Sequence, residues 1–292
     1  MKLKQILIVT IGLCFLSVSA ASAFKIYGVD DDSDTIKLFD TSTGNYDVIA
    51  QGVPDEIESL TWAGGTTYYG MRSDNARDST SQLYKFDISG DDVTWEAVGG
   101  EIAYNNIDAL QYADGMLYAT DNKKDKLLAL NTNGEVQGSV DVGALGLKKV
   151  EGLAYNNGTL YASDTNNDGQ KPTDDKAYTD HSSALFTIDI SNINISQGSI
   201  TGIDVQNVGQ IGFGQVEALL FADGALYGTS DMHNVFFQID LNATGDLGTY
   251  LNDWGSDIEG VAIAETAVPE PSTIILLGFG LLGLAAFKRK RK

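Results

Sequence analysis

The stretch DTNNDG, residues 164–169, places oxygen-bearing side chains at alternate positions in front of a glycine. Calcium takes about six to eight oxygen ligands, and carboxylates and amides that alternate around a sharp glycine turn supply them. Asp175 stands eleven positions after Asp164, where loops of the D-x-[DN]-x-[DN]-G type carry their last carboxylate. The spacing therefore predicts a Ca²⁺ site formed by Asp164, Asn166, Asp168 and Asp175.

Two features of this loop favour a simpler alternative. Lys171 stands where a helix-flanked calcium loop has an apolar residue, and no helices are expected on either side. A solvated polar loop stabilised by Asx-turns would have the same composition. The run from Asp30 to Asp34 occupies the same place in an earlier part of the chain, lacks the glycine and is a second candidate for calcium.

An acidic residue also recurs in five short apolar segments, which begin at residues 57, 107, 150, 216 and 258. We call these the ring acids: Glu58, Asp108, Glu151, Glu217 and Glu259. If each segment is the innermost strand of a sheet beside a central channel, five carboxylates meet at one level. Like charges repel strongly in a partly desolvated channel, and a cation would relieve the repulsion. The alternative is that each acid accepts a backbone N–H from the next sheet and fixes its orientation.

Two of these segments, Glu151-Gly152-Leu153 and Glu259-Gly260-Val261, resemble the Glu-Gly pairs on inner strands of six-bladed phytase-like and lactonase-like propellers. The resemblance is two or three residues long. It implies a calcium-dependent hydrolase that acts at the channel through Glu151, Glu217 and Glu259.

Other catalytic patterns do not occur in the sequence. His181 and His233, the two histidines, stand in different loops without an obvious arrangement of carboxylate and nucleophile. No G-x-S-x-G, H-E-x-x-H or phosphate-loop motif is present. A structural or binding role without catalysis is therefore expected ahead of the hydrolase.

The elements that must position these residues form an internal repeat. After four of the acidic segments comes a glycine-containing turn and a tyrosine-bearing strand, as in ADGMLYAT (113–120), NNGTLYAS (156–163), ADGALYGT (222–229) and AGGTTYYG (63–70). Asp-Gly or Asn-Gly between apolar runs predicts a two-residue hairpin. The tyrosines at one position per unit are expected to pack between sheets, with a sugar-stacking surface as the alternative: Tyr27, Tyr69, Tyr118, Tyr161 and Tyr227.

Four short antiparallel strands repeating about every 40–50 residues are typical of a propeller blade. The first unit begins at its second strand, and the segment from Ile258 to Ile263 supplies the missing first strand. We therefore predict an all-β, five-bladed propeller over residues 24–265, closed by the two ends of the mature body; an open sandwich or solenoid is the alternative. The longest spacing is attributed to an insertion over residues 164–183.

The first 23 residues have the pattern of a secretory signal. Two lysines precede an apolar run, and small residues end at Ala23, so cleavage would leave Phe24 as the first residue. A retained anchor is the alternative. Removal of residues 1–23 takes away Cys14, the only cysteine, and leaves a body without thiol chemistry. Residues 24–268 carry 12 basic and 39 acidic side chains, a formal charge of −27, which excludes nucleic acid as a partner.

The chain ends in VPEPSTIILLGFGLLGLAAFKRKRK, residues 268–292. Residues 271–287 are long enough for a short transmembrane helix, and the five basic residues after it favour the cytoplasmic side. The motif Pro269-Glu270-Pro271, the apolar segment and the basic end together resemble the PEP-CTERM sorting signal, here over residues 266–292. A plain single-span anchor is the alternative.

The resemblance implies recognition by an exosortase-type protease, transient anchoring in the inner membrane, and release to the cell surface or an exopolysaccharide matrix. The sequence thus predicts an exported, non-enzymatic propeller associated with exopolysaccharide, with Ca²⁺ as its candidate cofactor.

Overall fold

The computed structural model describes residues 24–73, 80–165 and 182–264. The predicted signal peptide (1–23), the transmembrane helix (271–287) and the sorting motif lie outside these residues. Within the described ranges, no helix is long and apolar enough to span a bilayer. The described elements are strands apart from two short 3₁₀ turns, η1 (Gly143–Leu145) and η2 (Asp231–His233).

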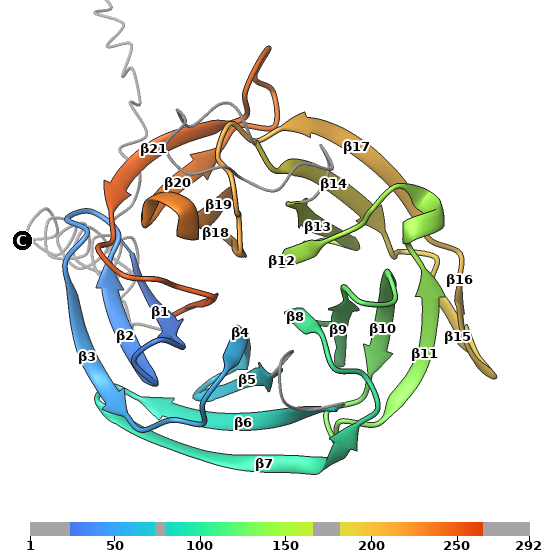
Figure 1. The fold of residues 1–292 in the computed structure, drawn as a ribbon, viewed down its shortest axis with the longest axis horizontal. Coiled ribbons are helices and arrows are strands. Elements are labelled where there is room, and N and C mark those ends of the chain that lie inside the picture. Colours follow the sequence, from blue (N-terminus) through green and yellow to red (C-terminus); the bar gives the residue numbers. More distant parts are fainter. Residues whose placement is uncertain (1–23, 74–79, 166–181, 265–292) are drawn as a thin grey trace, which may run out of the picture.

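Five sheets stand around a central axis as the blades of a propeller, which confirms the predicted fold class (Figure 1). Blade 1 consists of β22 (Gly260–Ile263), β1 (Lys25–Asp30), β2 (Thr35–Asp40) and β3 (Tyr46–Gln51). Blade 2 consists of β4 (Ile57–Gly64), β5 (Thr67–Arg72), β6 (Ser81–Ser89) and β7 (Asp92–Ile102). Blade 3 is built on β8 (Ile107–Ala113), β9 (Met116–Asp121), β10 (Lys126–Leu130) and β11 (Val136–Asp141).

The remaining two blades follow the same order. Blade 4 consists of β12 (Val150–Asn156), β13 (Thr159–Asp164), β14 (Ala184–Asp189) and β17 (Asp204–Gln210). Blade 5 consists of β18 (Ala218–Ala222), β19 (Ala225–Ser230), β20 (Val235–Ile239) and β21 (Gly248–Asp253). The first strand of each blade is innermost and mostly buried, whereas the outermost strands β3, β7 and β21 are mostly exposed.

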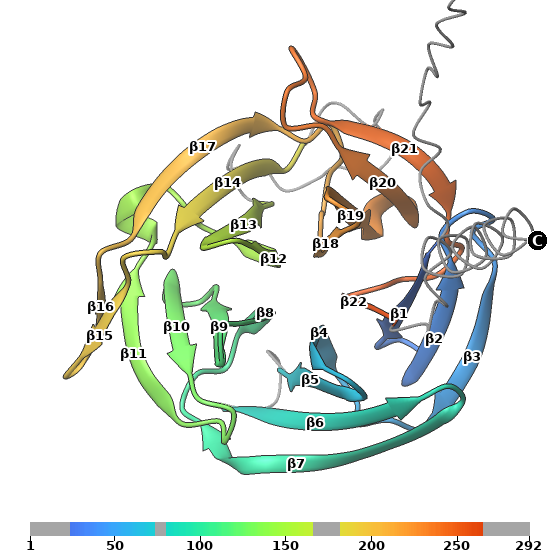
Figure 2. The ribbon, with the colours of Figure 1, turned by 180° about the vertical axis from the view of Figure 1, so that it is seen from behind.

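The two ends of the described body close the ring, as predicted. In Figure 2, β22 lies beside β1, and the two strands pair antiparallel, with Gly28 opposite Val261. The N–H of Ala264 also donates to the carbonyl of Lys25 at 3.0 Å. This pairing covers the inner edge of β1, an exposed edge that would otherwise invite pairing with another chain.

The hairpins that join first and second strands have the predicted turn geometry. In three blades both turn residues have positive φ, as a type I′ turn requires: Asp114–Gly115, Asn157–Gly158 and Asp223–Gly224.

The core is divided into five hydrophobic clusters, and each cluster lies between two neighbouring blades. The repeated tyrosines pack in these clusters; Tyr27, for example, meets Tyr68 of blade 2 edge to face at 5.4 Å between ring centroids. Because each blade completes its core only against the next one, the ring fixes the inner strands relative to one another.

The longest repeat contains two insertions, of which the sequence revealed one. The first separates β13 from β14 and includes the predicted polar loop. The second is a hairpin of β15 (Asn194–Ser196) and β16 (Gly198–Thr201), which leaves blade 4 and pairs parallel with β11 of blade 3. Attributing the whole excess length to residues 164–183 was therefore wrong.

Candidate functional site

The ring acids are placed at the start of the inner strands by a recurring irregularity. In blades 2, 3 and 4 the pairing register skips the acid, so Glu58, Asp108 and Glu151 are bulge residues. In the other two blades the acid directly precedes the first paired residue. A bulge re-aims a side chain that strict alternation would direct elsewhere. The same position thus turns toward the channel in each blade.

The residue after each ring acid is small: Ser59, Ala109, Gly152, Ala218 and Gly260. A Cβ built on Gly260 would lie 2.4 Å from the backbone nitrogen of Leu60 in the next blade. A Cβ on Gly152 would lie 3.0 Å from the backbone nitrogen of Leu219. Close approach of neighbouring inner strands therefore explains the two Glu-Gly pairs without catalysis.

The channel is narrow at this level. Its waist is a cavity of ≈ 10 Å³, lined by inner-strand residues of all five blades, among them Glu151, Glu217 and Glu259. A space of about 10–15 Å³ holds one water molecule or an ion of similar size. The waist cannot take an organic substrate.

Two of the ring acids are compensated by neighbours on their own blade. Asp108 accepts hydrogen bonds from the amide nitrogens of Asn106, at 2.8 and 2.6 Å, and of Asn122, at 2.7 Å. Glu151 forms an ion pair with Lys149. Burial raises the pKa of Glu151, and the Lys149 ammonium opposes the rise.

The other three ring acids have no cationic partner among the described residues. Burial is the largest cause that raises the pKa of Glu58, to about 9, and the negative charge of Asp108 adds to it. Burial followed by repulsion from Glu259 raises the pKa of Glu217 well above its ordinary value. Burial and then repulsion from Glu58 do the same for Glu259. Burial and repulsion from neighbouring acids both favour a bound proton or a bound cation at these carboxylates.

Further carboxylates lie beside Glu217 and Glu259 at one mouth of the channel. Two groups of three carboxylates, each with oxygen atoms within 4.8 Å of one another, share Asp257. One group adds Asp31 and Glu259, and the other adds Glu217 and Asp231. We call these five residues the mouth acids. They come from the turn after β1, from η2, and from the segments that lead into β18 and β22.

Several oxygens of the mouth acids lack a hydrogen-bond partner although they are buried. They are Asp31 Oδ1, Glu217 Oε2 and Asp257 Oδ1. Glu217 as a whole is only 8% exposed. Burial, followed by a hydrogen bond with Asp231, raises the pKa of Asp257 to about 8. Buried oxygens without donors are costly unless a proton or a metal ion satisfies them.

The loop residues predicted to form the Ca²⁺ site, and the two histidines, are not among the mouth acids. Asp164 is fully buried at the end of β13 and accepts the backbone N–H groups of Lys148, at 2.8 Å, and Lys149, at 3.2 Å. Asn166, Asp168, Asp175 and His181 lie outside the described residues. Asp30 forms a buried ion pair with Lys37. Burial lowers the pKa of His233, which follows Asp231 in η2.

For four of the five ring acids, the hydrogen bonds do not match the alternative in which each acid ties its blade to the next. In the described part of the chain, no backbone N–H of a following blade donates to Glu58, Glu151, Glu217 or Glu259. Hydroxyl groups at the ends of second strands bridge the blades instead. Thr120 Oγ1 donates to the carbonyl of Val150 at 2.9 Å, and Ser163 Oγ donates to that of Val216 at 2.7 Å.

Sequence reasoning missed Asp231 and Asp257, although a signal for Asp257 exists. The residue two positions before each ring acid is polar in every repeat: Glu56, Asn106, Lys149, Gln215 and Asp257. This position supplies partners for Asp108 and Glu151 in blades 3 and 4, and an extra carboxylate in blade 1. Asp231 stands in η2, a turn that does not recur at this place in the other blades.

Solved structures resemble this fold at low sequence identity. A crystal structure of a nidogen/laminin complex aligns with a TM-score of 0.51 and 13% identity, covering 82% of this chain and 98% of that one. The pyrroloquinoline quinone-bound aldose sugar dehydrogenase of Streptomyces coelicolor aligns with a TM-score of 0.44 and 16% identity, covering 82% and 81%. At 13% identity, the first likeness is one of fold alone.

Comparison of the sequence with known families is more specific, both for the body and for the C-terminal tail. Curated proteins give no match. Residues 267–291 match the PEP-CTERM protein-sorting motif, which confirms the resemblance of the tail and implies an exported protein. Residues 71–260, more than half of the chain, match the model of a repeat of unknown function, and the chain therefore belongs to that family, DUF6923.

Proposed function

We propose that this protein is an exported, non-enzymatic propeller that binds Ca²⁺ through its mouth acids and serves at the cell surface or in an exopolysaccharide matrix. The observation that supports it most is the pair of carboxylate groups joined by Asp257, with donor-free buried oxygens in both groups. The PEP-CTERM tail supports the exported location.

The donor set favours calcium over softer metals. All the ligand atoms are carboxylate oxygens, which hard cations such as Ca²⁺ prefer. Calcium accepts about six to eight oxygens in flexible geometry, with waters completing the shell. Five carboxylates from four loop or strand-start segments, in a body of charge −27, provide such a set.

The calcium-dependent hydrolase is less well supported. It requires Glu151, Glu217 and Glu259 to act on one substrate, but Glu151 is paired with Lys149 and belongs to neither carboxylate group. The waist beside these residues is also too small for a substrate. Turnover of a phosphate ester or lactone by the calcium-loaded protein would favour this alternative.

Calcium binding is tested by thermal unfolding of the full chain with CaCl₂ and with EDTA, alongside calorimetric titration. Calcium should raise the Tm with increasing concentration, as expected for a ligand that binds only the folded state. Asp257→Asn should remove this rise, because Asp257 belongs to both groups. Asp92→Asn, an exposed acid at the start of the outer strand β7, is the matched control and should retain it. A Tm of the unaltered protein that calcium leaves unchanged would reject the site.

Sorting is tested by fractionating cells that express the full chain in a parent strain and in a strain without its sorting protease. We expect release of the body from the parent and retention in the membrane fraction of the mutant strain. Replacing Pro269, Glu270 and Pro271 by alanine should reproduce the retention in the parent. Equal retention in both strains would leave a plain anchor as the explanation.

A further inference from the structure

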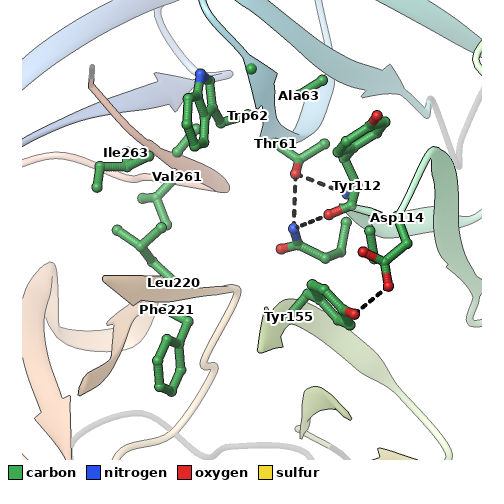
Figure 3. A pocket seen from close by; sticks show the side chains of 14 residues that line it. Thr61, Trp62, Ala63, Tyr112, Asp114, Tyr155, Leu220, Phe221, Val261 and Ile263 are labelled. Carbon is green, nitrogen blue, oxygen red and sulfur yellow. Dashed lines mark hydrogen bonds between the residues drawn. The ribbon is translucent and has the colours of Figure 1, made fainter. Parts of the chain in front are cut away.

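Aromatic side chains line the second mouth of the channel, opposite the mouth acids. The position four residues after each ring acid carries an aromatic side chain in four blades and Ile263 in blade 1. We call these the basin aromatics: Trp62, Tyr112, Tyr155 and Phe221. They line a pocket of ≈ 340 Å³ at the far ends of the inner strands, and Figure 3 shows them around its opening.

The basin aromatics are half-buried, and three of them are held in place on one side. The Trp62 indole N–H donates to the carbonyl of Gly65 at 2.9 Å, and the Tyr155 hydroxyl donates to Asp114 (Figure 3). Phe221 stacks on Tyr161 with ring centroids 6.0 Å apart. Rings fixed in this way lose little freedom when a ligand binds, which improves affinity.

The pocket also offers hydrogen-bond acceptors at defined places. The Gln111 amide nitrogen donates to Thr61 Oγ1 at 3.2 Å and to the Tyr112 carbonyl at 2.8 Å, which fixes the amide. No described residue donates to Gln111 Oε1 or to Asp114 Oδ1. The lining contains no lysine or arginine, so an anionic ligand would find Asp114 and no counter-charge.

The size and the ring arrangement decide between the remaining ligand classes. A volume of ≈ 340 Å³ lies at the lower end of about 300–1,000 Å³ found for small-molecule sites. Among the described residues, no ring contact joins two basin aromatics, so the ring faces are spaced around the pocket. A quaternary ammonium, which ring faces also bind, is the alternative that the choline probe tests. A flat ligand with an apolar face and hydroxyl edges suits spaced rings and free acceptors.

We propose that this pocket binds a neutral hexopyranose unit of a polysaccharide. The ring C–H groups pack on the basin aromatics, and hydroxyl groups donate to Gln111 Oε1 and Asp114. The proposal deepens the polysaccharide part of the proposed function and rests on it for the class of partner. It is independent of the calcium site, which lies at the opposite mouth.

Saturation-transfer NMR on the full chain tests the pocket with maltotriose, cellotriose and N-acetylchitotriose, and with choline and trigalacturonate as contrasting probes. At least one neutral sugar should receive saturation at its ring C–H protons. Trp62→Ala and Tyr155→Ala should each weaken its affinity about tenfold, the loss expected for one aromatic contact. Trp95→Ala, at an exposed tryptophan of the outer strand β7, should leave affinity unchanged.

A substitution at an exposed residue separates a loss of sugar binding from a loss of folding. Asp114→Gly removes an exposed acceptor, keeps the positive φ of the turn, and should weaken sugar binding while the melting curve stays cooperative. All titrations are repeated in EDTA, where sugar binding should persist even though the calcium site is empty. Saturation of choline or trigalacturonate alone, of no probe, or a loss equal in Trp95→Ala would overturn the proposal.

Discussion

Glu58, Glu217 and Glu259 show how one residue position produces both the stability problem and the proposed function of the channel. Each is removed from water beside other acids, and burial is the largest cause of its raised pKa. Asp108 and Glu151 occupy the same position but have amide or ammonium partners. In blades 3 and 4 the residue two positions earlier supplies a partner, whereas in blade 5 Gln215 donates to Asp231 and Glu217 Oε2 has no hydrogen-bond partner among the described residues.

At this scale we predict that stability without divalent cations falls as pH rises. The folded state keeps protons on Glu58 and its neighbours that the unfolded chain has already lost, so unfolding releases protons. For Glu58 this contribution is full below the ordinary value of 4.5 and is lost as the pH rises through about 9. Circular dichroism melts in EDTA over this interval should therefore give a declining Tm.

Asp30 and Asp40 have lowered pKa values, so their contribution is lost below their ordinary value of 3.8 and does not affect this window. The lowered pKa of His233 acts against the decline up to its ordinary value of 6.5, as one group against the several acids with raised pKa values. Glu58→Gln should reduce the slope by removing one of the titrating groups, whereas Glu96→Gln, an exposed residue of β7, should not. Saturating calcium should flatten the profile, because it replaces protons on the mouth acids. A Tm that rises with pH in EDTA would contradict the assignment.

At the scale of elements, the inner strands pack so closely that the residue after each ring acid is small. Gly260 in β22 faces the backbone of β4, and Gly152 in β12 faces that of β18. This contact joins blade 1 to blade 2 and blade 4 to blade 5, and the hydroxyl bridges from β9 and β13 join blade 3 to blade 4 and blade 4 to blade 5. The strand that closes the ring is therefore constrained on both sides, by β1 through pairing and by β4 through packing.

We predict that Gly260→Ala lowers the free energy of unfolding by about 1–3 kcal/mol, the usual cost of overpacking. The added Cβ would lie 2.4 Å from the Leu60 backbone nitrogen, and backbone yields less readily than a side-chain tip. Denaturant unfolding of the full chain measures the change. Gly245→Ala is the matched control, since nothing lies within 4 Å of its added Cβ. Equal stabilities of the two variants would show that β4 moves aside.

The elements that carry a repeated pattern were predictable, and those that depart from it were not. The Asp-Gly turns and the tyrosine strands identified five blades because the same local rules act in each unit. Among the described residues the β15–β16 hairpin has no counterpart in the other blades, and its strands of three and four residues are too short for a repeated pattern to reveal. For the site, the ring acids followed from repetition. Asp231 and Asp257 required knowing which turns meet in space.

At the scale of the whole molecule, ring closure gives the propeller two unlike mouths. The inner strands all run in the same sense, so residues at their starts gather at one mouth and residues at their ends gather at the other. Acidic positions at the starts create the proposed cation site, and aromatic positions four residues later create the proposed sugar site. Both depend on β22 completing the inner ring, since Asp257, Glu259 and Ile263 flank or belong to that strand.

The last prediction concerns this closure, tested with two shortened chains that differ by the seven residues 258–264. A chain ending at Ala264 keeps β22 and should melt like the full chain. A chain ending at Asp257 loses Ile258 and Val261 from the interblade core, where each large apolar side chain contributes about 1.5–3 kcal/mol. It should melt about 6–24 °C lower, because about 1 kcal/mol corresponds to 2–4 °C at this size. Size-exclusion chromatography should also show association of the shorter chain, since the freed edge of β1 can pair with another chain.

Equal melting temperatures for the two shortened chains, with both of them monomeric, would contradict this prediction. The pairing of β22 with β1 would then contribute nothing to stability, and a different contact would have to hold the ring closed.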